Sequence, residues 1–287
     1  MSFSMRMGMG LGAATSVAME QVDGYSYTNN EAAIYAAALT TAPDDTDAEA
    51  LDTFVGALKT TGVFAKLDSL KLLCNWDETG TAGANATCMF NLIAPTKHKG
   101  SVATGTVTST QYTGVSGAGS GALDDGFNPT TEGNLSSQDD VMFGVWVKTA
   151  ANEAEKVQIG GSTGNNNFML SRRWNSTPQY AIKINCNAYL DTLTLTTGLI
   201  AVIRTASNAW QVAYNATYAA SSATRSSVTP VDTNIAVLAN NYEESIARQT
   251  SDVLALSFVG KALSETEYGD FYSACNTFLT HLFGRSS

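Results

Sequence analysis

The chain has 287 residues, 44% of them hydrophobic, which is enough for one large packed domain with a small appendage. Only 15% of the residues are charged, whereas threonine (35), asparagine (20) and glycine (24) are abundant, and this composition favours strands and tight turns. The net charge of −10, with no basic run longer than Lys97–Lys99, argues against nucleic acid as a partner. No stretch approaches 18 apolar residues, so we expect no membrane insertion.

The N-terminus does not have the pattern of a secretory signal, because glycines interrupt the apolar run that follows Arg6. We therefore expect synthesis in a reducing cytosol, where cysteines remain thiols. No two cysteines have the spacing of a metal site. We predict buried thiols for all four, with a Cys74–Cys88 bridge as the alternative: Cys74, Cys88, Cys186 and Cys275.

Residues 1–24 form a low-complexity arm in which glycine alternates with methionine and leucine. In an extended backbone, this alternation places soft apolar side chains on one side and leaves the other side bare. Ordering such a strip costs conformational entropy, which a groove or sheet edge on another subunit could offset. We predict that residues 3–12 are anchored in a contact with copies of this chain or with other proteins. The anchoring side chains would be Phe3, Met5, Met7, Met9 and Leu11.

Residues 25–95 are expected to form a small helical segment. Thr28 and Glu31 have the spacing of a capping box, which would open an alanine-rich helix that ends before Pro43. A second helix is predicted from residue 45 or 46 to Gly62, because apolar residues recur at helical spacing between them. A strand at residues 69–74 and a helical turn within residues 84–92 complete the segment.

An acidic run opens the second helix: Asp44, Asp45, Asp47 and Glu49. Such a cluster could be a metal site, but acidic residues also favour the positive end of the helix dipole in the first turn. We adopt the helix-start interpretation.

From about residue 100 the hydrophobic pattern has a period of two, with Gly, Asn, Ser and Pro clusters between the apolar segments. This spacing is typical of an antiparallel two-sheet sandwich, which we assign to residues 96–287. The expected strands are residues 101–108, 121–125, 141–149, 156–161, 168–171, 180–186, 199–205, 210–214, 235–239 and 253–259.

The chain ends in a clear amphipathic helix, predicted at residues 264–283. Ser264 and Glu267 form a capping-box pattern, and Leu263 and Tyr268 have the spacing of a hydrophobic staple. One apolar face then continues for four turns before Gly284. This helix is expected to close the sandwich.

Four stretches carry a resemblance to a known family: Gly121–Pro129, Val141–Thr149, Leu199–Thr205, and Leu256–Ser264, which runs into the terminal helix. They are similar to the concanavalin A-like, laminin-G-type jelly-roll domains of tailed-phage virion proteins. The helical stretch 54–67 and the Met/Gly/Leu arm also look like the segments that precede such domains. The resemblance implies a jelly-roll sandwich and a role in a virion assembled in the host cytoplasm, without indicating which part of the particle.

Catalysis is not expected. A glycan hydrolase needs two carboxylates that flank the scissile bond, and the expected strands 141–149, 180–186 and 199–205 contain no acidic residue. The chain has only two histidines, His98 and His281, too few for a histidine-rich metal site. The glycine-rich residues 114–121 match neither a nucleophile elbow nor a phosphate-binding loop.

Binding of a host-surface glycan is the main alternative to a purely structural role. Sandwich lectins hold sugars with aromatic and amide side chains, sometimes beside Ca²⁺ held by Asp oxygens. The first Ca²⁺ ligands to consider would be Asp124 and Asp125, although no cofactor is expected. Candidate glycan-binding residues are Trp174, Asn175, Tyr180, Asn185, Asn187 and Tyr189. The sequence therefore predicts a non-enzymatic virion structural protein, with a glycan-binding lectin as the alternative and a glycan hydrolase as a distant third.

Overall fold

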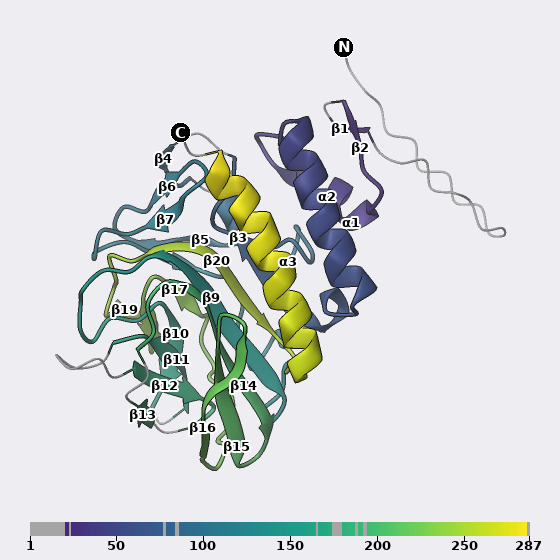
Figure 1. Cartoon of the computed structure of the whole chain (residues 1–287). Coiled ribbons are helices and arrows are strands. Elements are labelled where there is room, and N and C mark those ends of the chain that lie inside the picture. The colour runs from purple at the N-terminus through teal and green to yellow at the C-terminus, as the bar shows by residue number, and fades with distance from the viewer. Residues whose placement is uncertain are drawn as a thin grey trace.

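The fold has three layers, with helices on one sheet and that sheet packed on a second one (Figure 1). A computed structural model describes residues 21–22, 24–76, 79–83, 86–164, 166–173, 180–186, 189–191 and 194–285. The expected fold class is confirmed: a mainly β, antiparallel two-sheet sandwich with N-terminal helices and a C-terminal helix. None of the described helices is long and apolar enough to cross a membrane.

The sheet that the helices cover is the middle layer and is called the middle sheet. Its strand order is β16-β15-β14-β9-β20-β7-β6-β4, and β3 also pairs with β20. Its strands are β3 (Leu67–Leu72), β4 (Gly80–Thr81), β6 (Thr108–Thr110), β7 (Gly114–Ser116), β9 (Val141–Thr149), β14 (Gly198–Ala206), β15 (Ala209–Tyr214), β16 (Thr217–Thr224) and β20 (Val253–Gly260).

The outer sheet has the order β13-β12-β11-β10-β17-β8-β5, and β18 joins it through a parallel pairing with β10. Its strands are β5 (Ser101–Thr104), β8 (Ala122–Asp124), β10 (Ile159–Thr163), β11 (Asn166–Ser171), β12 (Tyr180–Ile184), β13 (Tyr189–Asp191), β17 (Ala236–Val237), β18 (Asn240–Tyr242) and β19 (Ser245–Ala247). A separate hairpin pairs β1 (Gln21–Val22) with β2 (Tyr25–Ser26).

The centre of the middle sheet is buried on both faces. Along β9, Phe143 and Val145 pack between the two sheets, whereas Met142 and Trp146 face the helices. Strand β20 pairs with β9 along its length, with register shifts between Val253 and Leu256, and beyond them Phe258 faces the helices while Val259 faces the outer sheet. Gly144 is required at the centre of β9, because a Cβ atom there would lie 2.0 Å from the carbonyl oxygen of Ile200.

The helices are α1 (Asn30–Ala38), α2 (Asp45–Thr60) and α3 (Glu265–Gly284), with short 3-10 turns η1 (Phe64–Lys66) and η2 (Thr87–Met89). Helix α3 begins with the predicted capping box of Ser264 and Glu267, which is confirmed. Helix α2 begins after Asp44, whose side chain accepts hydrogen bonds from the amides of Thr46 and Asp47, and Gly62 follows its end with a φ of +76°.

The predicted capping box of Thr28 and Glu31 is wrong. Helix α1 starts at Asn30, and its N-cap residue Asn29 makes no side-chain capping bond. The capping role is taken by Asp52 of α2. The Asp52 carboxylate accepts hydrogen bonds from the backbone amides of Thr28 and Asn29, each at 2.8 Å. Glu31 instead pairs with Lys59 on α2.

Most of the predicted strands are present, but several bounds differ. The expected strand at residues 101–108 ends at Thr104, where Gly105 turns the chain with a φ of +60°. The expected strands at residues 156–161 and 235–239 correspond to β10 and to the two-residue β17. All four cysteines are buried thiols, as predicted, and Cys74 and Cys88 form no disulfide.

We expect Asp52→Asn to lower the free energy of unfolding by about 2 kcal/mol at neutral pH, because an amide cannot accept both N–H groups as a carboxylate does. Burial alone would raise the pKa of Asp52, but hydrogen bonds from Thr28 and Asn29 hold it below its ordinary value. The stabilisation is therefore complete above the ordinary carboxyl pKa and is lost as the pH falls through the lower folded-state value. Urea unfolding at about pH 7 and about pH 2.5 should show the gap between wild type and variant closing in acid. An equal gap at both pH values would contradict this assignment.

Candidate functional site

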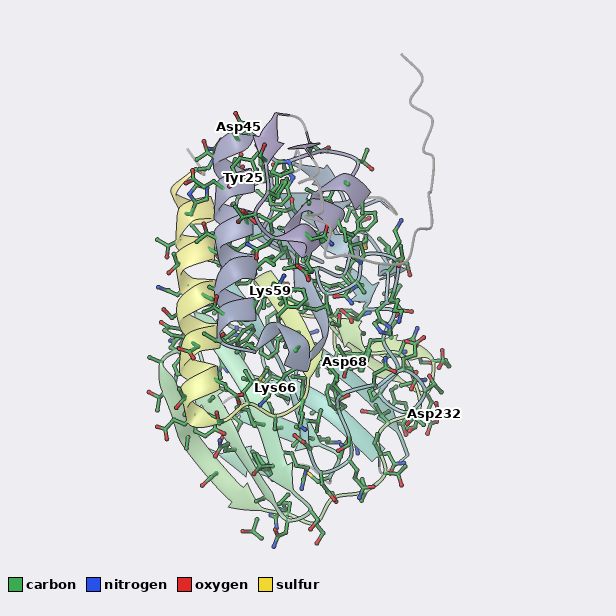
Figure 2. All side chains as sticks on the ribbon, turned by 90° about the vertical axis from the view of Figure 1, so that its right-hand side faces the viewer. Tyr25, Asp45, Lys59, Lys66, Asp68 and Asp232 are labelled. Atoms are coloured by element: carbon green, nitrogen blue, oxygen red, sulfur yellow. The ribbon has the colours of Figure 1, made fainter. Side chains whose placement is uncertain are left out.

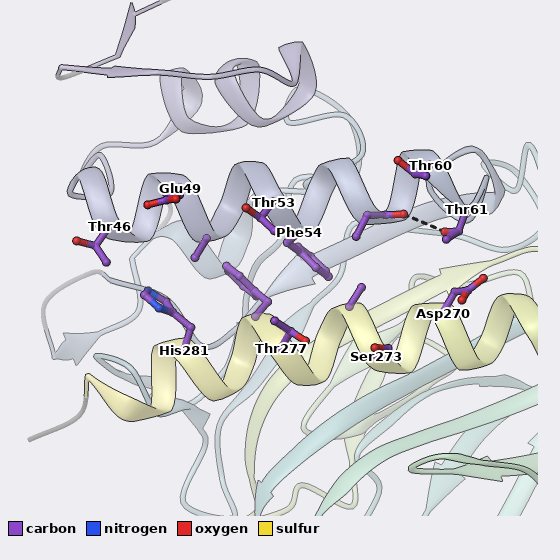
Figure 3. A pocket seen from close by; sticks show the side chains of 14 residues that line it. Thr46, Glu49, Thr53, Phe54, Thr60, Thr61, Asp270, Ser273, Thr277 and His281 are labelled. Carbon is purple, nitrogen blue, oxygen red and sulfur yellow. Dashed lines mark hydrogen bonds between the residues drawn. The ribbon is translucent and has the colours of Figure 1, made fainter.

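A groove lies between α2 and α3 and is called here the α2–α3 groove (Figure 3). Its volume is about 700 Å³. It is open along the outer side of the two helices, as Figure 3 shows. Its lining residues are Thr46, Glu49, Ala50, Thr53, Phe54, Ala57, Thr60, Thr61, Asp270, Ser273, Ala274, Thr277, Phe278 and His281.

The groove exists because each helix buries its large side chains and turns small ones outward. On α2, Leu51, Val55 and Leu58 pack into the core, while Ala and Thr recur every three or four residues on the groove side. Helix α3 repeats this arrangement with Ser, Ala and Thr. The floor is a stacked aromatic pair, Phe54 and Phe278, whose ring centroids are 4.8 Å apart.

One end of the groove is fixed by the buried carboxylate of Asp47. This carboxylate accepts hydrogen bonds from the Tyr112 hydroxyl at 3.0 Å and from His281 Nε2 at 2.9 Å, and Arg285 Nε lies 3.4 Å away. Arg285 also pairs with Asp44. Burial opposes ionisation of Asp44, but the Asp47 amide and Arg285 hold the pKa of Asp44 below its ordinary value. The start of α2 is thereby tied to the end of α3.

The acidic run 44–49 acts as the helix start that the sequence predicts, because Asp44 is the N-cap and protein cations engage Asp44 and Asp47. Glu49 remains exposed on the groove wall, and the half-buried Asp270 adds a second acidic group. Figure 3 places Glu49 and Asp270 near opposite ends of the groove. They are therefore not arranged as a carboxylate pair around one scissile bond.

The predicted glycan-binding residues are not assembled into an exposed site. Tyr180 is fully buried between the sheets, and Asn185 is 1% exposed, with its Nδ2 donating to the carbonyl oxygen of Gln138 at 3.0 Å. These two predictions are wrong, because side chains enclosed in this way cannot contact a sugar. Of the remaining predictions, Trp174, Asn175 and Asn187 lie outside the described residues, as does the side chain of Tyr189.

A smaller pocket of about 250 Å³ lies beside the end of β11 and is more polar. Arg172 is fixed there by Asp252, whose carboxylate accepts from Arg172 Nε and Nη2, each at 2.7 Å. Its lining residues are Asn152, Arg172, Arg173, Thr194, Leu195 and Thr196.

The two Asp residues considered for Ca²⁺ already have protein partners. Asp124 accepts from the amide of Gly126 at 2.7 Å, and Asp125 accepts from the Ser69 hydroxyl at 3.0 Å. Burial raises the pKa of Asp125 to about 6, against the opposing charge of Lys71. Over the described ranges, no three His, Cys, Asp or Glu side chains gather in a way that could hold a metal ion.

The predicted anchoring side chains Phe3, Met5, Met7, Met9 and Leu11 lie outside the described residues. The α2–α3 groove itself was not predicted. The signal for it is the repeat of small residues on α2 opposite the apolar face, at positions 46, 50, 53, 57 and 60.

Comparisons with known proteins give likenesses of fold only. No family model matches the chain, and no curated protein matches it. The NanB sialidase from Streptococcus pneumoniae is similar at a TM-score of 0.37 and 13% identity, over 47% of this chain and 24% of that one. Domain 4 of AbnA, a GH43 extracellular arabinanase from Geobacillus stearothermophilus, in complex with arabinotriose, is similar at a TM-score of 0.41 and 12% identity. The match covers 68% of this chain and 100% of that one. The botulinum neurotoxin serotype D binding domain is similar at a TM-score of 0.43 and 12% identity, over 74% of this chain and 52% of that one.

This chain thus spans about a quarter of the sialidase and about half of the toxin domain structure. At these identities and TM-scores, neither activity nor ligand carries over to it.

We expect Asp47→Ala to lower the free energy of unfolding by about 2–3 kcal/mol, because it removes a buried acceptor shared by Tyr112, His281 and Arg285. The loss stays below that of a fully buried ion pair, since the side chains of His281 and Arg285 are 28% and 31% exposed. Asp45→Ala, two residues earlier on the exposed side, is the matched control and should change stability by less than about 0.5 kcal/mol. Equal unfolding midpoints for the two variants in urea would show that Asp47 does not tie the helices together.

Proposed function

We propose that this protein is a non-enzymatic structural component of a larger assembly and that the α2–α3 groove is its docking site for another protein chain. The observation that carries the proposal is the groove itself, in which small side chains on both helices leave a long open channel over the Phe54–Phe278 stack. Small residues on two adjacent helices let the side chains of a third segment enter between them.

The shape of the groove favours a chain segment over a small ligand. From Thr46 to Thr60 the α2 wall is about 21 Å long, at 1.5 Å per residue. A small-molecule site would instead enclose its ligand and aim several polar groups at one point. In this groove the acidic groups are spread along the walls, and its histidine already donates to Asp47.

A virion is the assembly that the sequence resemblance favours. The sandwich would serve as a rigid body, and the helix layer would provide the contact with neighbouring virion proteins. The lack of a carboxylate pair in the groove supports a structural role over glycan hydrolysis.

Filling the groove should block assembly without unfolding the protein. We expect Ala57→Phe and Ala274→Phe to lower incorporation into purified particles by at least about tenfold, because each ring occupies space that a docked segment needs. Ala37→Phe, on the exposed side of α1, is the matched control and should be incorporated normally. Quantitative mass spectrometry of the particles measures incorporation, and urea unfolding checks that all three variants are folded. Normal incorporation of both groove variants would refute the proposal.

Carbohydrate binding is a second candidate function, supported by the pocket that contains Arg172 and Arg173. Arg173, Asn152 and two threonine residues make a polar lining in a protein of net charge −10, while the Arg172 guanidinium is already bound by Asp252. Guanidinium groups bind carboxylates with fixed geometry, so this pocket would suit an acidic sugar.

If this second function holds, the full chain should bind acidic oligosaccharides on a glycan array in preference to neutral ones. Arg173→Ala should then weaken binding at least about tenfold. Lys97→Ala removes an exposed positive charge at a position that does not line the pocket, and should leave binding unchanged. The absence of binding to any acidic glycan, or equal binding by wild type and Arg173→Ala, would rule out this site.

A further inference from the structure

We propose that the α2–α3 groove binds residues 3–12 of a second copy of this chain, so that exchanged arms join the subunits. This inference rests on the proposed docking function of the groove and names its partner.

The arm has the large apolar side chains that most of the groove wall lacks. Most of the groove wall consists of alanine, serine and threonine side chains above two phenylalanine rings. The arm has large, adaptable apolar side chains at Met5, Met7, Met9 and Leu11. Methionine fills irregular apolar space well, and glycines between these residues permit close backbone approach.

The charges of the two surfaces are complementary. Glu49 and Asp270 line the groove, and Asp45 lies at its His281 end beside Asp44, which already pairs with Arg285. Arg6 is the only charged side chain among the first 19 residues. An arm laid in the groove therefore brings a guanidinium group to acidic walls.

The length of the arm and the position where it leaves the described chain also match the α2–α3 groove. Residues 3–12 in extended form span roughly 30 Å, enough to follow the whole groove. The described chain starts at β1, whose Val22 pairs with Tyr25. The next turn lies at the N-terminal end of α2, where a Cβ atom on Gly24 would be 3.7 Å from Asp45 Oδ1. Figure 2 shows Tyr25 and Asp45 at that same end of α2, which is where the groove begins.

The connection to the arm favours a neighbouring subunit over the same molecule. Residues 13–22 contain no Gly, Pro, Asn or Asp, which are the residues that most readily reverse a chain. A short connection without a turn signal does not favour folding the arm back onto its own body, and short connections favour exchange between identical subunits. Two copies can each donate an arm and receive one.

Disulfide trapping in the full chain tests this inference. Separately purified Met9→Cys and Thr53→Cys variants are mixed under mild oxidation, so a bond between them requires two molecules. Thr53 lies on the groove wall and is exposed. Thr131→Cys, an exposed threonine away from the groove, replaces Thr53→Cys in the matched control. The native cysteines are buried, so they compete little with the introduced thiols for disulfide formation.

We expect a covalent heterodimer of Met9→Cys with Thr53→Cys, forming at least about tenfold faster than the dimer with Thr131→Cys. Equal rates would overturn the inference. The inference would also be overturned if a Met9→Cys/Thr53→Cys double variant formed the disulfide only within one chain, because the groove would then hold the molecule's own arm. If trapping fails while Ala57→Phe and Ala274→Phe still block incorporation, the groove docks a different chain and only the inference falls. If those variants also assemble normally, the proposed function falls with it.

Discussion

The double burial of the middle sheet is the constraint on which the rest of this structure depends. Strands β9 and β20 form a continuous antiparallel pair with apolar side chains on both faces. One face is covered by the outer sheet, as in any sandwich. The other face would expose Trp146 and Phe258 to water, so helices must cover it, and Phe271 of α3 meets the Phe258 ring edge-on at 5.0 Å. The terminal helix is therefore part of the core.

Polar contacts fix α2 to both of its neighbouring helices in this layer. The Asp47 cluster joins the start of α2 to the end of α3, and the Asp52 carboxylate joins α2 to the start of α1. Phe54 and Phe278 bridge the two groove walls as a stacked pair. Such contacts would preorganise the surface for a partner, which would lower the entropy cost of docking.

The sequence predicts best those elements whose pattern is local and strong. Residues 141–149 alternate clearly and form β9 with the predicted bounds, and the Ser264 capping box opens α3 as expected. Edge strand β16 lacks a hydrophobic period of two, because its residues are mostly small and polar. The remote cap by Asp52 could not be predicted, since it joins residues more than twenty positions apart. Tyr180 was misassigned by residue type, although its alternation with Ile182 and Ile184 indicates the core.

The central claim is that the α2–α3 groove holds another protein chain when the protein is assembled. An experimental structure of the full-length protein in its assembled state tests this most directly. We expect continuous main-chain density between α2 and α3, in contact with Thr53 and Thr277. A groove that remains filled only by solvent in the assembled state, with neighbouring subunits joined elsewhere, would contradict it.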